Sequence, residues 1–119
     1  GGAYVEQASL NFAMLSYDLQ KYADAFYGYQ SLSQNARIEN NRHIAVEGMM
    51  NSAYHAKDYS AAIENAKKLG SDPRSDADDK RRASYVEAKS YLATSHRDEA
   101  FAILKHRPRL LRALRLPIC

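Results

Sequence analysis

Two pairs of histidine and acidic residues have a spacing that could begin a metal site. His43 and Glu47 lie four residues apart, which would place them on one face of a helix. His55 and Asp58 lie three residues apart across a polar stretch. A structural zinc site needs four ligands, and no third ligand accompanies either pair. We therefore expect solvated surface groups or weak helix ion pairs at these positions, and no metal or other cofactor.

Motifs that carry catalysis are also missing from the sequence. It contains no phosphate-binding loop, no nucleophile elbow, and no Ser, His and Asp set whose spacing supports catalysis. Its single cysteine, Cys119, is the last residue and is a poor candidate for a nucleophile. The sequence therefore favours a non-enzymatic, binding role.

The positive charge of the chain is concentrated at one end. Of 119 residues with a net charge of +3, the segment 107–119 holds four Arg and no acid. The remainder carries thirteen Lys and Arg against fourteen Asp and Glu, a net charge of −1. A nucleic-acid-binding domain usually shows a basic face within its fold. No apolar run approaches the ~20 residues of a membrane span. The composition thus argues against a nucleic-acid-binding body and against a transmembrane segment.

One segment occurs three times and predicts the architecture. The copies are "SYDLQKYADA" (16–25), "AYHAKDYSAA" (53–62) and "YLATSHRDEA" (91–100), each a polar turn that ends in Ala. Apolar residues precede each turn at the i, i+3, i+4, i+7 spacing of one helix face. They are Leu10, Ala13, Met14 and Tyr17; Val46, Met49, Met50 and Ala53; and Tyr85, Ala88 and Leu92. A second, shorter apolar row follows each turn. The sequence therefore predicts an all-α chain of helix, turn, helix and linker, repeated every 37–38 residues.

The linker between the second and third copies carries boundary signals. Gly70 is suited to a left-handed position after the preceding helix, and Pro73 blocks its continuation. Ser75 or Asp76 can cap the next helix, with Asp78 and Asp79 near its positive end. Since two helices alone cannot bury both apolar faces, we expect the three copies to stack, with Ala25, Ala62 and Ala100 where the helices cross.

The turn segments carry a family resemblance. "YHAKDYSAA" (54–62) and "YDLQKYADAFYGY" (17–29) resemble tetratricopeptide repeats, and 91–100 matches less fully because Arg97 replaces the Tyr of the other copies. The resemblance covers roughly 6–106 and implies a right-handed α-solenoid of three repeats. The repeat domain is 3–106, with repeats at about 6–39, 43–76 and 81–106; Gly1 and Gly2 are expected to be vector-derived. The family's standard repeat has 34 residues, and the longer spacing here is similar to bacterial envelope proteins of the outer-membrane assembly and Tol-Pal-associated type. That likeness implies a periplasmic or outer-membrane-associated location, with a cytoplasmic one as the alternative.

The same resemblance implies a scaffold or adaptor that grips a peptide or partner protein in a concave groove lined by the first helix of each repeat. An alternative is that Tyr17 and Tyr54 mainly pack between repeats. The carboxylate clamp of chaperone-binding relatives is absent, since Leu10 and Met14 stand where it needs Lys and Asn. The implied partner-binding residues are Asn11, Met14, Tyr17, Asp18, Glu47, Asn51, Tyr54, His55, Tyr85 and Lys89, with Arg82 as a further candidate.

The basic tail, 107–119, can be drawn as a helix with Leu110, Leu111 and Leu114 opposite Arg109, Arg112 and Arg115. Three interpretations stay open for it: a helix that caps the third repeat, a segment that binds nucleic acid or an anionic membrane, or a segment foreign to the domain. The second gives the alternative function, a nucleic-acid-binding helical repeat protein. If the tail does not cover the third repeat, a second copy of the chain is expected to do so, which would give a homo-oligomer.

Overall fold

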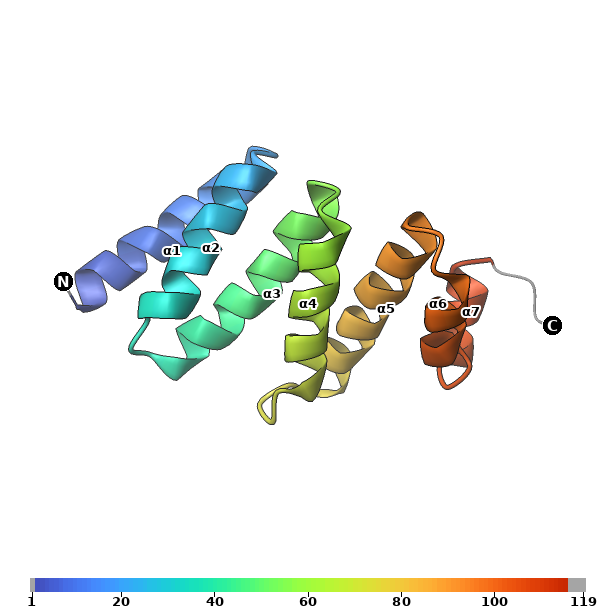
Figure 1. The fold of residues 1–119 in the computed structure, drawn as a ribbon. Helices are drawn as coiled ribbons and strands as arrows, with labels where there is room; N and C mark the ends of the chain where they lie inside the picture. The colour runs from blue at the N-terminus through green and yellow to red at the C-terminus, as the bar shows by residue number, and fades with distance from the viewer. Residues whose placement is uncertain (1, 116–119) are drawn as a thin grey trace.

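The computed structural model describes residues 2–115, which form seven α-helices and no strand (Figure 1). The predicted all-α class is therefore confirmed for this part of the chain. Gly1 and residues 116–119, which include Cys119 and the end of the basic tail, lie outside the described residues. The helices are α1 (Ala3–Asp18), α2 (Tyr22–Asn35), α3 (Glu39–His55), α4 (Tyr59–Ser71), α5 (Ala77–Ala93), α6 (Arg97–Leu104) and α7 (Pro108–Ala113).

The helices form a row in which each packs against the next. α2 packs on α3 as closely as on α1, and α4 packs on α5 as closely as on α3. The molecule is consequently elongated, measuring 54 × 28 × 19 Å, with α1 at one end and α7 at the other (Figure 1).

The turn that recurs in the sequence has the same conformation each time. Gln20, Lys57 and Ser95 are left-handed, with φ of 61°, 64° and 63°. In each copy the next residue donates its N–H, at 2.8 Å, to the carbonyl five residues earlier; the pairs are Lys21 to Ser16, Asp58 to Ala53, and His96 to Tyr91. This bond closes the end of the first helix and reverses the chain. The same type of turn therefore joins α1 to α2, α3 to α4, and α5 to α6.

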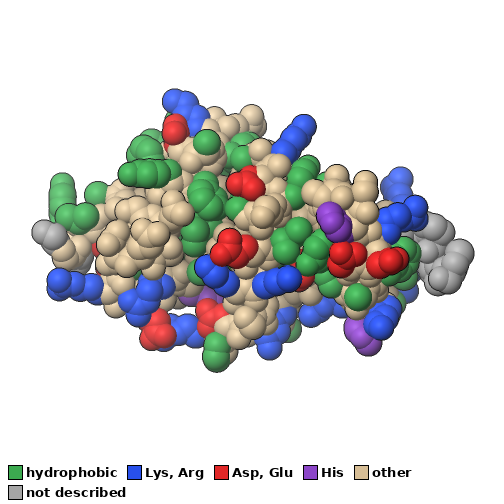
Figure 2. Space-filling model, in the orientation of Figure 1, with side chains coloured by type: hydrophobic (Ala, Val, Ile, Leu, Met, Phe, Trp, Pro, Cys, Tyr) green, Lys and Arg blue, Asp and Glu red, His purple; other side chains and the backbone are tan. Residues whose placement is uncertain are grey.

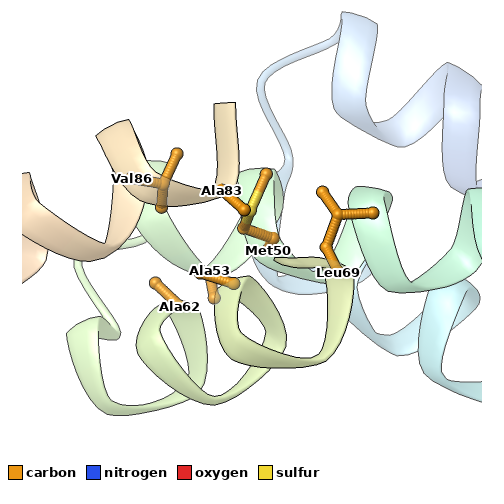
Figure 3. Packing of buried hydrophobic residues seen from close by; sticks show 7 residues of the cluster. Met50, Ala53, Ala62, Leu69, Ala83 and Val86 are labelled. Atoms are coloured by element: carbon orange, nitrogen blue, oxygen red, sulfur yellow. The ribbon is translucent and has the colours of Figure 1, made fainter. Parts of the chain in front are cut away.

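Small residues lie where the helices cross, as predicted. Ala25, Ala62 and Ala100 are all fully buried. The central cluster joins α3, α4 and α5, and Figure 3 shows its side chains pointing toward one another. Its buried members are Met50, Ala53, Ala62, Ala66, Leu69, Ala83 and Val86. Short side chains allow the helix backbones to approach closely, so the array is held by many small contacts.

The predicted role of Gly70 is wrong. α4 continues through Gly70 to Ser71, and Gly70 has no positive φ. The helix ends because Asp72 is extended, the conformation favoured before proline at position 73. The predicted cap of α5 is confirmed: Asp76 accepts the N–H of Asp79 at 2.8 Å, and the Asp79 carboxylate accepts the N–H of Asp76.

The described part of the tail lies on α6. Pro108 begins α7, where its missing N–H breaks no helical hydrogen bond. Leu110 is buried in a cluster with Ala88, Ala100 and Leu104, and Leu111 and Leu114 pack around it. The side chains of Arg109 and Arg112 are exposed. α7 therefore covers an apolar face that α6 would otherwise present to solvent.

Candidate binding groove

The helix pairs α1–α2, α3–α4 and α5–α6 are the first, second and third units. The first helices of the second and third units, α3 and α5, together form a groove of about 430 Å³. On α3 the lining residues are spaced at i, i+3 and i+4, so they share one helix face. One face of α5 supplies the other wall. The lining residues are Asn51, Tyr54 and His55 from α3, and Arg82, Tyr85, Val86 and Lys89 from α5. Five residues of the predicted set, and Arg82, are thus brought together.

Lys89 is held between two tyrosine rings of the groove. Its Nζ lies 5.3 Å from the centroid of the Tyr85 ring and 5.8 Å from that of Tyr54, distances typical of cation–π contacts. The interaction with Tyr54 raises the pKa of Lys89, burial opposes it, and Tyr85 adds to the increase. Lys89 is therefore a positioned positive charge at neutral pH, with its ammonium group oriented by rings from both helices.

Arg82 connects the groove to acidic residues outside it. Its guanidinium lies 3.6 Å from a carboxylate oxygen of Glu47 and 3.5 Å from one of Asp79. Glu47, which the sequence placed among the partner-binding residues, is therefore engaged by Arg82. Since the charged side chains that line the groove are those of Arg82 and Lys89, and no acidic residue lines it, the groove suits acidic groups of a ligand.

His55 connects the groove to the first unit. Its ring stacks on Tyr22, with centroids 5.0 Å apart and planes at 22°. Tyr17 and Tyr54 approach the same ring edge-on, at 5.9 and 5.6 Å. Burial raises the pKa of Tyr17. Both tyrosines thus pack at the boundary between units, and Tyr54 also lines the groove.

A smaller hollow, of about 90 Å³, lies between the first and second units. Three residues of the predicted set line it: Tyr17, Glu47 and Asn51, and Asn51 is shared with the larger groove. Its remaining lining residues are Tyr29, Ile44 and Gly48. The hollow is small because Tyr29 reaches from α2 to the surface of Gly48.

The other predicted residues of α1 line neither hollow. Asn11, Met14 and Asp18 are exposed. Asn11 accepts a hydrogen bond from the Gln7 side chain at 3.0 Å, one helical turn away. The structure therefore gathers the α3 and α5 residues of the predicted set and leaves these three apart from them.

No protein-family model, no curated protein and no solved structure matches this chain. None of the helices within residues 2–115 combines the length and the apolar character that a membrane crossing requires. Across the same residues, no group of three or more His, Cys, Asp or Glu side chains could hold a metal ion. The function proposed below accordingly rests on the fold and on the groove.

His43 has a role that its helical spacing from Glu47 did not indicate. Nδ1 lies 3.0 Å from Asp72 and Nε2 lies 3.3 Å from Asp79, so the ring joins α3 to the α4–α5 linker and to α5. The hydrogen bond to Asp72 raises the pKa of His43, burial opposes this, and Asp79 adds to the increase. The expectation of a solvated group or a helix pair is wrong, because His43 is only 15% exposed and both partners are distant in sequence.

Glu6 has the equivalent role one unit earlier, and sequence reasoning missed it. Its buried carboxylate accepts the N–H groups of Arg37 and Ile38, at 2.8 and 3.3 Å, and a hydrogen bond from Asn41. The Arg37 N–H is the largest influence that lowers the pKa of Glu6. Glu6 precedes His43 by 37 residues, as Asn41 precedes Asp79 by 38. The repeat interval could therefore have indicated from the sequence that Glu6 corresponds to His43 and that Asn41 corresponds to Asp79.

Proposed function

We propose that the chain is a non-enzymatic protein–protein interaction scaffold of the tetratricopeptide type. In this proposal its three units stack as a right-handed α-solenoid, with α1, α3 and α5 on the concave side. The identical turns at Gln20, Lys57 and Ser95 support the repeat, as do the buried alanines that follow each turn. The equivalent junctions at Glu6 and His43 support regular stacking of the units.

The groove between α3 and α5 is the observation that carries the binding role. Tyr54 and Tyr85 offer aromatic area, and Asn51 offers an amide that can bond a peptide backbone. Recognition sites commonly combine such area with a few placed polar groups. A peptide in extended conformation is the ligand that these side chains suit best.

The charge of the groove narrows the proposed ligand to a peptide with an acidic side chain. Lys89 is already held by Tyr54 and Tyr85, so little side-chain freedom is lost when it meets a carboxylate. Arg82 stands on the same face of α5 and can contribute while it remains near Glu47.

A random-peptide display library tests this proposal. Selected peptides are synthesised and their affinities measured by calorimetry with the wild-type chain and with Lys89→Ala and Tyr85→Ala variants. We expect enrichment of Asp and Glu, and binding at least about tenfold weaker in both variants, equivalent to ~1.4 kcal/mol. Lys80→Ala is the matched control, since Lys80 is exposed on α5 outside the groove. Selected peptides that bind all four proteins equally would contradict the proposed groove.

A further inference from the structure

The outer face of the first unit is unusually apolar for a surface exposed to solvent. Hydrophobic side chains project from the α1 end of the molecule in Figure 2. Phe12 is 49% exposed and Leu15 is 60% exposed. A groove of about 320 Å³ runs between α1 and α2 on this face. Its lining residues are Tyr4, Val5, Ala8, Ser9, Phe12, Tyr27, Gly28 and Ser31.

The second unit has a groove at the same repeat positions. Six of its lining residues follow residues of the first groove by exactly one repeat interval of 37. The pairs are Val5 and Arg42, Ser9 and Val46, Phe12 and Met49, Tyr27 and Glu64, Gly28 and Asn65, and Ser31 and Lys68. The second groove has an additional wall, which α2 supplies through Phe26, Gln30, Ser33 and Gln34. No helix within residues 2–115 gives the first groove such a wall.

Burial shows the same difference between the units. Ala45 and Ser52 of α3 are fully buried, and Met49 nearly so, on the face that α2 covers. Their equivalents on α1, namely Ala8, Leu15 and Phe12, are all exposed. On α5 the equivalents of Ala45 and Ser52, namely Ala83 and Ser90, are again buried where α4 packs, and Glu87, the equivalent of Met49, is half-buried. Within residues 2–115, a preceding helix therefore covers this face of α3 and of α5.

The absence of charge on the outer face of the first unit indicates which kind of ligand would bind there. Three positions that are charged in the second groove are uncharged in the first: Arg42, Glu64 and Lys68 correspond to Val5, Tyr27 and Ser31. The wall that α2 gives to the second groove also carries no charge. An amphipathic helix whose contacting face carries no charge matches both observations, since a charge on that face would lose hydration without gaining a partner.

We propose that the outer face of α1 and α2 binds an amphipathic helix whose contacting face carries no charge, in the way that α3 receives α2. The interface would continue the α2–α3 and α4–α5 contacts by one further step. The bound helix would run antiparallel to α1, as α2 runs antiparallel to α3. Tyr29 of α2 contacts Gly48, whereas Leu32, which lies later on α2, packs with Ala45, which lies earlier on α3. A second copy of the chain is a poorer occupant, since α7 already covers the exposed side of its last helix pair.

The chain itself supplies a probe for this face. A copy of residues 22–38 is joined directly before Gly2. Gly2 precedes Glu39 by one repeat interval of 37, so the copied segment would then lead into α1 as residues 22–38 lead into α3. We expect the extension to raise the unfolding midpoint and to slow amide hydrogen exchange of α1 at least tenfold. The matched control is the same extension with Asp at the copied positions of Tyr29 and Leu32, two of the α2 residues that contact α3.

A second variant keeps the test decisive. Leu15→Asp should leave the unextended chain folded, because Leu15 is largely exposed there, and should abolish the gain in the extended chain. If both extensions change the midpoint and the exchange equally, the proposed helix site is wrong. A dimer of the unextended chain that Leu15→Asp dissociates would also overturn it, by assigning the face to a second copy. Neither result depends on the α3–α5 groove, which lies outside this face.

Discussion

The ring of Tyr29 lies directly against Gly48, where α2 crosses α3. A Cβ atom on Gly48 would lie 2.5 Å from three carbon atoms of that ring, closer than real Cβ contacts allow. Tyr29 is itself only 7% exposed, so it has little space into which it could move. The α2–α3 junction therefore depends on the absence of a side chain at position 48.

Gly48→Ala should lower the free energy of unfolding by about 1–3 kcal/mol, because the added methyl group overpacks the junction. Urea unfolding measures this change. Gly70→Ala is the matched control, since its Cβ would meet only Ala83, at 3.7 Å, in ordinary contact. There we expect a gain of about 0.5–1 kcal/mol from the lower backbone entropy of alanine in the unfolded chain. A Gly48→Ala variant as stable as wild type would show that Tyr29 can move aside.

The left-handed turn between α3 and α4 predicts opposite effects of two substitutions at Lys57, which has a φ of 64°. Lys57→Val should destabilise the chain by about 1–2 kcal/mol, since β-branched residues are strained in this region. Lys57→Gly should be neutral or stabilising, because glycine adopts this conformation freely. Thermal unfolding measures both. Lys80→Val, at an exposed position in α5, is the control and should cost less than about 0.7 kcal/mol. The reverse order of the two Lys57 variants would contradict the turn.

The His43 junction predicts a loss of stability on the alkaline side. The pKa of His43 is raised in the folded chain, first by Asp72 and also by Asp79, and Arg82 shares Asp79 with it. Its contribution is therefore complete below the unfolded pKa of about 6.5 and is lost as pH rises through the higher folded value. We expect the wild-type chain to lose about 1 kcal/mol more than His43→Gln between pH 6 and pH 9 in urea titrations. His106→Gln, at an exposed site, should follow the wild-type profile.

The Glu6 junction predicts the opposite dependence. The Arg37 N–H, followed by the Asn41 side chain, lowers the pKa of Glu6 in the folded chain. Its contribution is present above the unfolded pKa of about 4.3 and is lost as pH falls through the lower folded value. Glu6→Gln should therefore lower the melting temperature at pH 7, and the difference from wild type should shrink toward pH 3. The exposed Glu99 gives the control variant, Glu99→Gln, for which we expect no comparable change. A constant difference across this pH range would show that ionisation of Glu6 is not involved.

The sequence alone was sufficient for the helix pairs, for the positions of the turns within them and for the small residues where the helices cross. Ala25, Ala62 and Ala100 recur with a period that can be read directly, and each is buried. Asp76 was likewise one of two residues predicted to cap α5, and it is the N-cap; the reciprocal hydrogen bond to the Asp79 carboxylate was not predicted. These features depend on neighbours within a few residues, so local spacing and helix geometry were enough to predict them.

Tertiary structure alone decided which residues meet across the helices. Asn51, Tyr54, Tyr85 and Lys89 converge on one groove, while Met14 remains apart on α1. The spacing between neighbouring first helices follows from side-chain volume at the helix crossings, which no helical period contains. The contacts of His43 show the same limit, because Asp72 and Asp79 lie 29 and 36 residues away. Spacing along the chain predicts a helix face, but the partner of that face depends on how the helices stack.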